Sequence, residues 1–166
     1  MLGLMQRYPL LISSLITHAA RHRGGSEVVS NLGGPTLHRT TYAEVERRSR
    51  RLARALGKLG VGLGDRVATL AWNDFRHLEL YYGVSGMGAV CHTVNPRLSA
   101  EDIGFIMTDA EDSILFADPS FGPLLTTASH NNGGACRARV RRPSWPTHRS
   151  GARQRERRNL SRARSR

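Results

Sequence analysis

The stretch Arg66–Asp118, RVATLAWNDFRHLELYYGVSGMGAVCHTVNPRLSAEDIGFIMTDAEDSILFAD, decides the fold. Short apolar runs in it are predicted to form buried β-strands: Arg66–Ala71, Val90–Val94 and Ser113–Asp118. Longer segments between these runs have the spacing of helices, Phe75–Ala89 and then Ala100–Ala110 after a capping Ser99. The alternation of strand and helix predicts an α/β fold with a parallel sheet covered by helices. Glycines in the first helix are expected to allow close packing on that sheet.

The residues before this stretch predict two helices and a hairpin. A weakly amphipathic helix is expected near the start, with Pro9 in its first turn and an apolar face. That face consists of Ile12, Leu15, Ile16 and Ala19. The runs EVVSNL and TLHRT flank Gly33-Gly34-Pro35, which predicts a β-hairpin. A short, serine-broken apolar stretch argues against a signal peptide, and no apolar run reaches the length of a membrane span.

The segment TYAEVERRSRRLARALGKLG, residues 41–60, has the strongest helical pattern in the chain. Thr41 and Glu44 have the spacing of a capping box, and Gly60 is placed to end the helix. The expected buried face is Tyr42, Val45, Leu52, Leu56 and Leu59. The expected surface ion pairs are Glu44 with Arg48 and Glu46 with Arg50. The arginine run therefore reads as a solvated helix face and not as a nucleic-acid-binding surface.

Charge divides the chain into two unequal parts. The 166 residues carry a net charge of +12, but residues 1–128 contain 13 Lys and Arg against 12 Asp and Glu, a net of +1. Residues 129–166 contain 12 Arg and the single acid Glu156, a net of +11. The body is therefore nearly neutral, and the basic character belongs to the C-terminal segment.

The C-terminal segment, residues 129–166, lacks apolar periodicity and is expected to be a disordered, Arg-rich tail. Its mixture of Arg, Ser, Gly, Pro and Ala is typical of a GC-rich gene translated out of frame, with the frame shift expected between Thr126 and Asn132. The rival interpretation is a genuine basic arm that binds nucleic acid, with Trp145 available to stack on a base. The two expected units are thus residues 1–128 and residues 129–166.

Several residue patterns were weighed as sites. Gly60, Gly62 and Gly64 lie between a helix and a strand, whereas a dinucleotide loop needs a strand first, so they predict an α-to-β turn. His18 and His22 are four residues apart on a helix, but no third metal ligand accompanies them.

The two cysteines, Cys91 and Cys136, have no metal-site spacing, and Cys91 is expected to be a buried, reduced thiol, which favours the cytoplasm. Its neighbour His92 should point to the opposite face of the strand, so the two cannot easily form a dyad. Asp65, Asp74, Glu79 and Asp109 form no recognisable acid–base pair. The sequence predicts no catalytic, cofactor-binding or metal-binding residue.

The segment from the TYAE helix to SILFAD resembles the start of an acyl-CoA synthetase of the adenylate-forming, AMP-binding superfamily. The resemblance rests on TYAE, LGVGLGDRVATLAWN, YYGVSGMGAVCHTVNPRL and DAEDSILFAD in that order, and it extends over residues 1–125. It is strongest with medium- and long-chain fatty acid–CoA ligases. The fold it implies is part of a doubly wound sheet whose remaining strands would come later in the chain.

The resemblance implies a fatty acid and coenzyme A as reactants and ATP with Mg²⁺ as cofactors. The activity that the resemblance implies is formation of an acyl-adenylate, followed by transfer of the acyl group to coenzyme A as a thioester. The family's phosphate loop, its ribose-binding Asp and its C-terminal catalytic Lys have no counterpart here, and Lys58 lies on the exposed face of an early helix. We therefore expect the chain alone to bind no cofactor and to be inactive. A further alternative is a regulatory protein that pairs with a full-length ligase.

Overall fold

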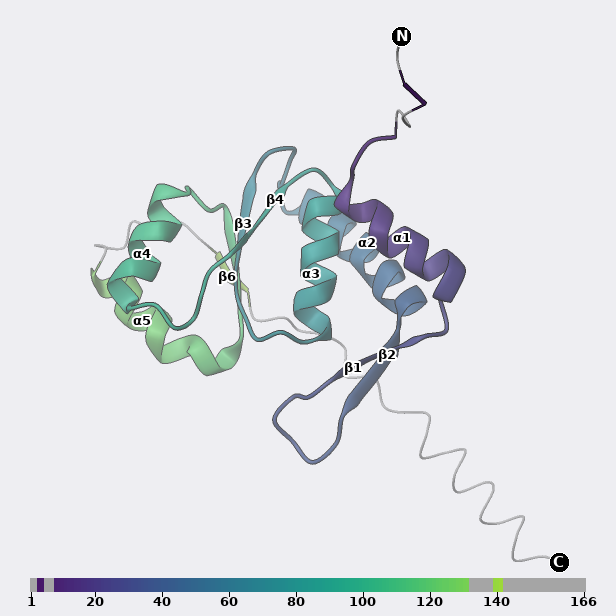
Figure 1. The fold of residues 1–166 in the computed structure, drawn as a ribbon. Helices are drawn as coiled ribbons and strands as arrows, with labels where there is room; N and C mark the ends of the chain where they lie inside the picture. The colour runs from purple at the N-terminus through teal and green to yellow at the C-terminus, as the bar shows by residue number, and fades with distance from the viewer. Residues whose placement is uncertain (1–2, 5–7, 132–138, 142–166) are drawn as a thin grey trace, which may run out of the picture.

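The computed structural model describes residues 3–4, 8–131 and 139–141, and it contains two sheets and a set of covering helices (Figure 1). In chain order the elements are α1 (Ile12–Arg23), β1 (Glu27–Ser30), β2 (His38–Thr41), α2 (Tyr42–Lys58), β3 (Arg66–Leu70), α3 (Phe75–Gly86), β4 (Val90–Thr93), α4 (Ala100–Asp109), β5 (Ile114–Ala117), a 3₁₀ turn (Pro119–Phe121), α5 (Gly122–Asn131) and β6 (Arg139–Arg141). The three strands and two helices predicted for the central stretch are confirmed, as is the hairpin of β1 and β2.

The main sheet has the strand order β4-β3-β5-β6, with every neighbouring pair parallel. Val67 of β3 lies between Cys91 of β4 and Ile114 of β5 in the register. Because β5 follows β4 in sequence but lies on the other side of β3, the chain crosses over the sheet between them. This order confirms a doubly wound α/β fold.

Helices cover both faces of the sheet. Alternate residues of β3 and β5 point to opposite sides, as the two-residue repeat of a strand requires. Ala68 and Leu70 join the core formed with α4 and α5, which includes Ile103. Val67 joins the other core, with α2, α3 and the fully buried Leu56. In Figure 1 the helices α1, α2 and α3 lie together on one side of the sheet, and α4 and α5 lie on the other.

The start of α2 has the predicted cap and one of the two predicted ion pairs. The Oγ1 atom of Thr41 accepts a hydrogen bond from the backbone N–H of Glu44, 3.3 Å away. The Glu44 side chain pairs with Arg47 rather than with Arg48. Arg48 pairs instead with Glu79 of α3, so the predicted pair of Glu44 and Arg48 was wrong. The predicted pair of Glu46 and Arg50 is confirmed.

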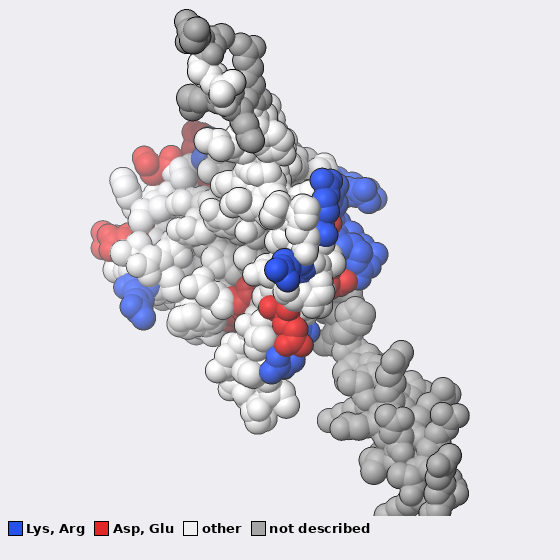
Figure 2. All heavy atoms as spheres, turned by 45° about the vertical axis from the view of Figure 1, so that its right-hand side comes forward, with Lys and Arg blue, Asp and Glu red and all other residues white. Residues whose placement is uncertain are grey.

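Exposed arginines occupy the solvent side of α2, as expected for a solvated face. On the face drawn in Figure 2, most of the Lys and Arg side chains in view lie toward one side, beside a largely uncharged surface. The predicted apolar face of α2 is buried at Val45 and Leu56, whereas Leu59 at its end is partly exposed. Gly60 follows with a φ of +89°, a conformation that favours glycine, and the helix ends there.

Gly83 of α3 allows a close approach, but the partner is a helix and not the sheet. A Cβ atom at Gly83 would lie 3.0 Å from both the carbonyl oxygen of Ser49 and the Cδ2 atom of Leu52, which belong to α2. The expectation of glycine-mediated packing on the sheet was therefore wrong for this residue. Glycine at this position lets the backbones of α2 and α3 come together.

The first helix begins later than predicted. α1 starts at Ile12, so Pro9 lies outside it, and Leu11 stands at the N-cap without a side-chain cap. Ile16 is buried, but Leu15 is 63% exposed and does not share the predicted buried face. The weak apolar spacing therefore predicted the helix correctly, but it predicted the buried face of that helix only in part.

The C-terminal part of the described chain differs from the expectation of disorder at six residues. α5 continues through residue 128 to Asn131, and Arg139–Arg141 forms a strand that pairs with β5. The other residues of the segment 129–166 lie outside the described residues, so the proposed boundary at residue 128 stays a prediction. In the part of the chain that the structure describes, no helix is long and apolar enough to cross a membrane.

Candidate functional site

A hollow lies where the parallel strands of the main sheet end. Beyond the carboxyl ends of β3 and β5 is a cavity of about 320 Å³. Its apolar wall includes Trp72, Leu80 and Phe116, and its polar wall includes His77 and Asp118. Open α/β sheets bind ligands outside the carboxyl ends of their strands, and this volume falls within the range of small-molecule sites.

A second, more open hollow of about 800 Å³ continues from the first toward β4 and the hairpin. The two share Trp72, Asp74 and His77, so they form one crevice with two arms. The second arm is lined further by Tyr81 and Arg97. β4 and β5 lie on opposite sides of β3, so the chain connections leave the end of β3 in two directions. The crevice lies at this point of the sheet.

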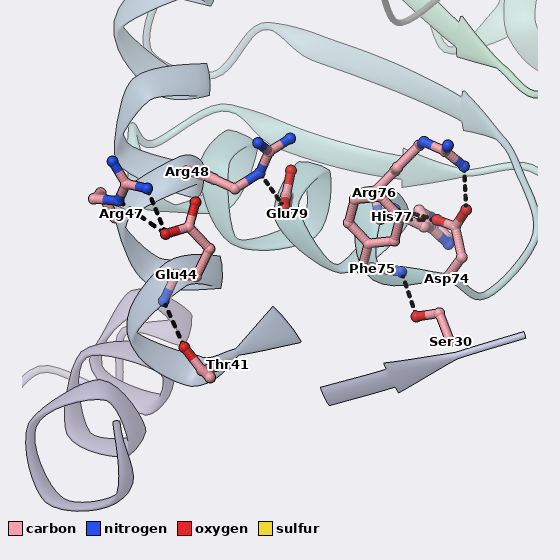
Figure 3. Close-up of polar contacts among 10 residues, drawn as sticks. All are labelled: Ser30, Thr41, Glu44, Arg47, Arg48, Asp74, Phe75, Arg76, His77 and Glu79. Carbon is pink, nitrogen blue, oxygen red and sulfur yellow. Dashed lines mark hydrogen bonds and ion pairs between the residues drawn. The ribbon is translucent and has the colours of Figure 1, made fainter. Parts of the chain in front are cut away.

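Asp74 organises the crevice at the start of α3. Its Oδ1 atom accepts hydrogen bonds from the backbone N–H groups of Arg76 and His77, at 2.8 and 3.0 Å (Figure 3). Its Oδ2 atom pairs with the guanidinium of Arg76 at 3.0 Å. A carboxylate at the N-cap satisfies helix donors and complements the helix dipole, so Asp74 holds this end of α3 in place.

The hairpin is tied to the same helix end. The backbone N–H of Phe75 donates to the Oγ atom of Ser30 at 3.0 Å, in a buried bond that joins β1 to α3 (Figure 3). The ring of His38 on β2 stacks on Phe75 with 3.8 Å between centroids. These contacts fix one wall of the crevice relative to the other.

His77 is a titratable group that lines both arms of the crevice. Its Nε2 atom lies 3.0 Å from the Oγ1 atom of Thr69, a buried residue of β3. Burial lowers the pKa of His77 from its ordinary value of 6.5, and the nearby Asp74 carboxylate opposes this only in part. His77 is therefore neutral at pH 7 and offers hydrogen bonds without positive charge.

A short polar chain closes the other wall. The Nε1–H of Trp72 donates to the Oγ atom of Ser120 at 3.0 Å, and that hydroxyl donates to Asp118 at 2.7 Å. The indole ring packs on Phe121 with 4.8 Å between centroids. Trp72 is thus held in orientation at the mouth of the crevice.

Two further features of the described residues bear on the binding of ATP and Mg²⁺. Among the described residues, no cluster of three His, Cys, Asp or Glu side chains fits a metal ion. The glycine turn precedes β3, with the Gly62 N–H donating to Asp65 at 2.8 Å, so it offers no phosphate cradle at a helix start. Neither feature gives ATP or Mg²⁺ a recognised binding group among the described residues.

The histidines of α1 and Lys58 line neither arm of the crevice. The rings of His18 and His22 lie 4.4 Å apart on the exposed side of α1, and the described residues near them form no metal-binding group of three. Lys58 is exposed at the end of α2, as predicted. Cys136 and Trp145 lie outside the described residues.

Cys91 and His92 point to opposite faces of β4, as predicted. Cys91 packs against the core of α2 and α3, and burial raises the pKa of its thiol to about 11. The Nδ1 atom of His92 lies 2.8 Å from Asp112, whose pKa is raised by burial. His92 is thus a strand histidine with a partner.

Sequence reasoning missed His77 and the buried pair of Arg48 and Glu79. The Nε atom of Arg48 donates to Glu79 at 2.6 Å, and the Glu79 side chain is 2% exposed. A signal was present, since Glu79 interrupts an apolar helical run and Asn73-Asp74 precedes it in the manner of a helix cap. Which residue each of these side chains contacts depends on the tertiary packing, and the neighbouring sequence does not indicate it.

The fold and the crevice define an α/β domain of the doubly wound class with a ligand-type hollow at the carboxyl edge of its sheet. The protein-family model described as "AMP-binding enzyme" matches residues 16–161. The chain belongs to this family, and it corresponds to the N-terminal portion of an acyl-CoA ligase.

Curated relatives agree with this assignment. The chain is 51% identical over 125 residues to a medium-chain-fatty-acid–CoA ligase of Ectopseudomonas oleovorans, a match that covers 75% of this chain and 23% of the relative. It is 56% identical over 110 residues to a long-chain-fatty-acid–CoA ligase of Thermus thermophilus, covering 66% and 20%. The chain therefore spans about a quarter of the length of these relatives or less.

Solved structures share the fold. A fatty acyl CoA synthetase of Mycobacterium tuberculosis superposes with a TM-score of 0.68 at 25% identity, covering 78% of this chain and 26% of that one. An anthranilate CoA ligase superposes with a TM-score of 0.69 at 19% identity, covering 82% and 27%, which shows the fold alone. The α/β arrangement is thus that of the N-terminal part of these enzymes.

Proposed function

We propose that this chain is part of a fatty acid–CoA ligase and supplies scaffold rather than catalytic groups. The observation that carries the proposal is the identity of 51% and 56% with medium- and long-chain fatty acid–CoA ligases. The complete reaction joins ATP and a fatty acid into an acyl-adenylate with release of pyrophosphate. Coenzyme A then takes the acyl group as a thioester and AMP leaves. Mg²⁺ assists at the phosphates, and the cytoplasm is the expected compartment.

The chain alone is expected to be inactive. His77, Asp74 and Arg76 are engaged with the helix start and with Thr69, and they are not arranged as an acid–base pair around a reacting atom. The phosphate loop and the catalytic Lys of the family are absent from the sequence. The chain therefore contributes sheet, core and crevice wall to a larger active enzyme.

Joining this chain to the remainder of a relative tests the proposal. The 110 residues of this chain that match the Thermus thermophilus ligase replace the corresponding segment of that enzyme. Acyl-CoA formation is then measured with medium- and long-chain acids. We expect the chimera to be active and the present chain alone to show no ATP–pyrophosphate exchange. A correctly folded but inactive chimera, beside an active parent enzyme, would count against the proposal. Exchange activity in the chain alone would contradict its inactivity.

The C-terminal segment is proposed to be an out-of-frame product from near residue 129 onward. Its composition supports this, and two of the fatty acid–CoA ligase matches extend over 125 and 110 residues. The family match, in contrast, continues to residue 161, and β6 lies inside the segment. Translation of all three forward frames downstream of the Leu125 codon distinguishes an out-of-frame segment from one that belongs to the family. A family-like sequence with a Ser/Thr/Gly-rich loop ending in Lys in another frame supports the frame shift.

Nucleic-acid binding is the second candidate, favoured by 12 Arg among the last 38 residues. Its weakness is that Arg139–Arg141 is a strand of the main sheet rather than part of a free arm. Deleting residues 142–166 should remove any salt-dependent affinity for RNA or DNA if the segment is a binding arm. Unchanged, salt-insensitive binding would exclude this function for the segment.

A further inference from the structure

The first helix presents a stripe of exposed side chains away from the rest of the domain. Leu11, at the N-cap of α1, and Leu15 are 58% and 63% exposed, and His18 and His22 are exposed one and two turns further on. Ile16, on the other side of the helix, is buried. In Figure 1 α1 lies at the outer side of the layer that it forms with α2 and α3, so the stripe faces away from that layer.

The stripe of Leu11, Leu15, His18 and His22 has the repeat of a coiled-coil seam. Its members follow one another at intervals of four, three and four residues, the spacing that places one side of a helix against a partner helix. Ser14 and Ala19 flank the stripe, and both are small and uncharged, so a second helix can approach closely. The partner that fits this stripe is therefore another helix with apolar and imidazole groups at the same spacing.

A second copy of the chain meets this requirement, because its own α1 presents the same four side chains. In a parallel pair, Leu11 and Leu15 pack on their counterparts, and the imidazoles of both copies meet at the other end of the helices. In an antiparallel pair, the imidazoles lie against leucines without a polar partner, which is costly. Two leucine layers fall short of the roughly three heptads that a coiled coil needs, so the leucines alone do not hold the parallel pair together.

The two imidazoles supply what the leucines lack. The rings of His18 and His22 lie side by side on successive turns, with 4.4 Å between their centroids. Zinc takes imidazole nitrogens among its preferred ligands and needs about four ligands in a tetrahedron. Among the described residues of one chain no group of three His, Cys, Asp or Glu is available, so one copy offers only this pair. Two parallel copies bring both pairs together and complete a set of four nitrogens.

We propose that two copies of the chain associate through parallel α1 helices, and that His18 and His22 of both copies bind one Zn²⁺ ion between them. The metal is held by four neutral imidazole nitrogens, and no bond is broken and no electron is transferred. The leucine end of the stripe supplies apolar contact, and the histidine end supplies the metal bridge. Because α1 contributes no residue to either arm of the crevice, the association does not depend on the proposed ligase function.

Sedimentation velocity of the purified full chain tests the proposal. We expect a monomer in EDTA and a dimer after addition of Zn²⁺. His18→Gln and His22→Gln should each weaken the Zn²⁺-dependent dimer by about a hundredfold or more, because losing merely a hydrogen-bond partner of a metal ligand costs about 10–100-fold. The matched control is Arg23→Gln, since Arg23 is exposed on the same helix but lies off the stripe. This variant should dimerise like the wild type.

Co²⁺ absorption reads out the metal site itself. Co²⁺ in tetrahedral surroundings absorbs visible light far more strongly than Co²⁺ with six ligands. We expect strong visible bands with the wild-type chain and their loss in the double variant His18→Gln, His22→Gln. Because both imidazoles are exposed, the circular dichroism of the variants should match that of the wild type, so loss of the bands reports loss of the site and not of the fold.

A cysteine cross-link reports the direction of the helices. In a Cys136→Ser background, Leu11→Cys should form a disulfide between two copies when Zn²⁺ is present, because parallel helices place the two Leu11 positions opposite each other. An antiparallel pair places Leu11 near His22 of the second copy and prevents this disulfide. The control is Phe105→Cys, because Phe105 is also exposed but belongs to α4 on the other side of the sheet. It should not cross-link.

Three results would overturn the proposal. One is a chain that stays monomeric in Zn²⁺, and another is a Zn²⁺-dependent dimer that persists in the double variant His18→Gln, His22→Gln. The third is a dimer in which Leu11→Cys does not cross-link, since that excludes the parallel arrangement. None of these measurements uses ligase activity, so a failure of the proposed function leaves the association through α1 intact.

Discussion

Arg48 of α2 and Glu79 of α3 form an ion pair across the seam of the two helices, with 2.6 Å between the Nε and Oε1 atoms. The side chains are 17% and 2% exposed, so the pair lies largely out of water (Figure 3). A buried carboxylate of this kind needs a partner, because an unpaired charge in the interior is costly. The pair therefore fixes which face of α2 meets α3.

Removing one member of this pair should destabilise the chain strongly. Glu79→Ala leaves the Arg48 guanidinium partly buried without its carboxylate, and the expected loss in the free energy of unfolding is about 3–5 kcal/mol. Urea unfolding followed by circular dichroism measures it. The control is Glu27→Ala, which removes the exposed partner of Arg39 and should cost less than about 1 kcal/mol. Similar losses for the two variants would contradict the role of the buried pair.

A side chain at Gly83 should push the same two helices apart. Gly83→Val brings Cβ within 3.0 Å of the Ser49 carbonyl oxygen, a backbone atom that cannot move away alone. The expected cost is about 1–3 kcal/mol, as for other overpacked sites. Gly57→Ala is the matched control, because a Cβ there meets nothing within 4 Å and Ala favours the helix by up to about 1 kcal/mol. A Gly83→Val variant as stable as the wild type would show that the seam is loosely packed.

The sequence predicted β3, β4 and β5 and the helices between them well, because local signals and burial agree there. Ser99 caps α4 through the backbone N–H of Asp102, and the run Ile114–Ala117 is buried throughout β5, both as expected. Residues whose role depends on a distant partner were not predictable. Glu79 finds Arg48 31 positions away, and His77 meets Thr69 only because α3 folds back over β3. The same limit explains why the crevice escaped prediction.

His77 should make the stability of the chain depend on pH near neutrality. Its pKa in the folded chain is below the unfolded value of 6.5, so above that value both states are neutral. As the pH falls through 6.5, the unfolded chain takes up a proton first, and stability is lost. His77→Gln should flatten the dependence of the unfolding free energy on pH between about 7 and 5. His22→Gln, on exposed α1, controls for the loss of an imidazole; equal pH dependence in His77→Gln and wild type would contradict the assignment.

Cys91 should react slowly with alkylating agents while the chain is folded. Burial raises the pKa of its thiol from 9.0 to about 11, and two units lower the thiolate fraction at pH 8 about a hundredfold. The neutral thiol's contribution to stability is complete below pH 9 and is lost as the pH rises toward 11, because the unfolded thiol ionises first. In a Cys136→Ser background, iodoacetamide modification at pH 8 should be slower by about that factor in the folded chain than in denaturing urea. Equal rates in the two conditions would show that packing of Cys91 against the core of α2 and α3 does not protect its thiol.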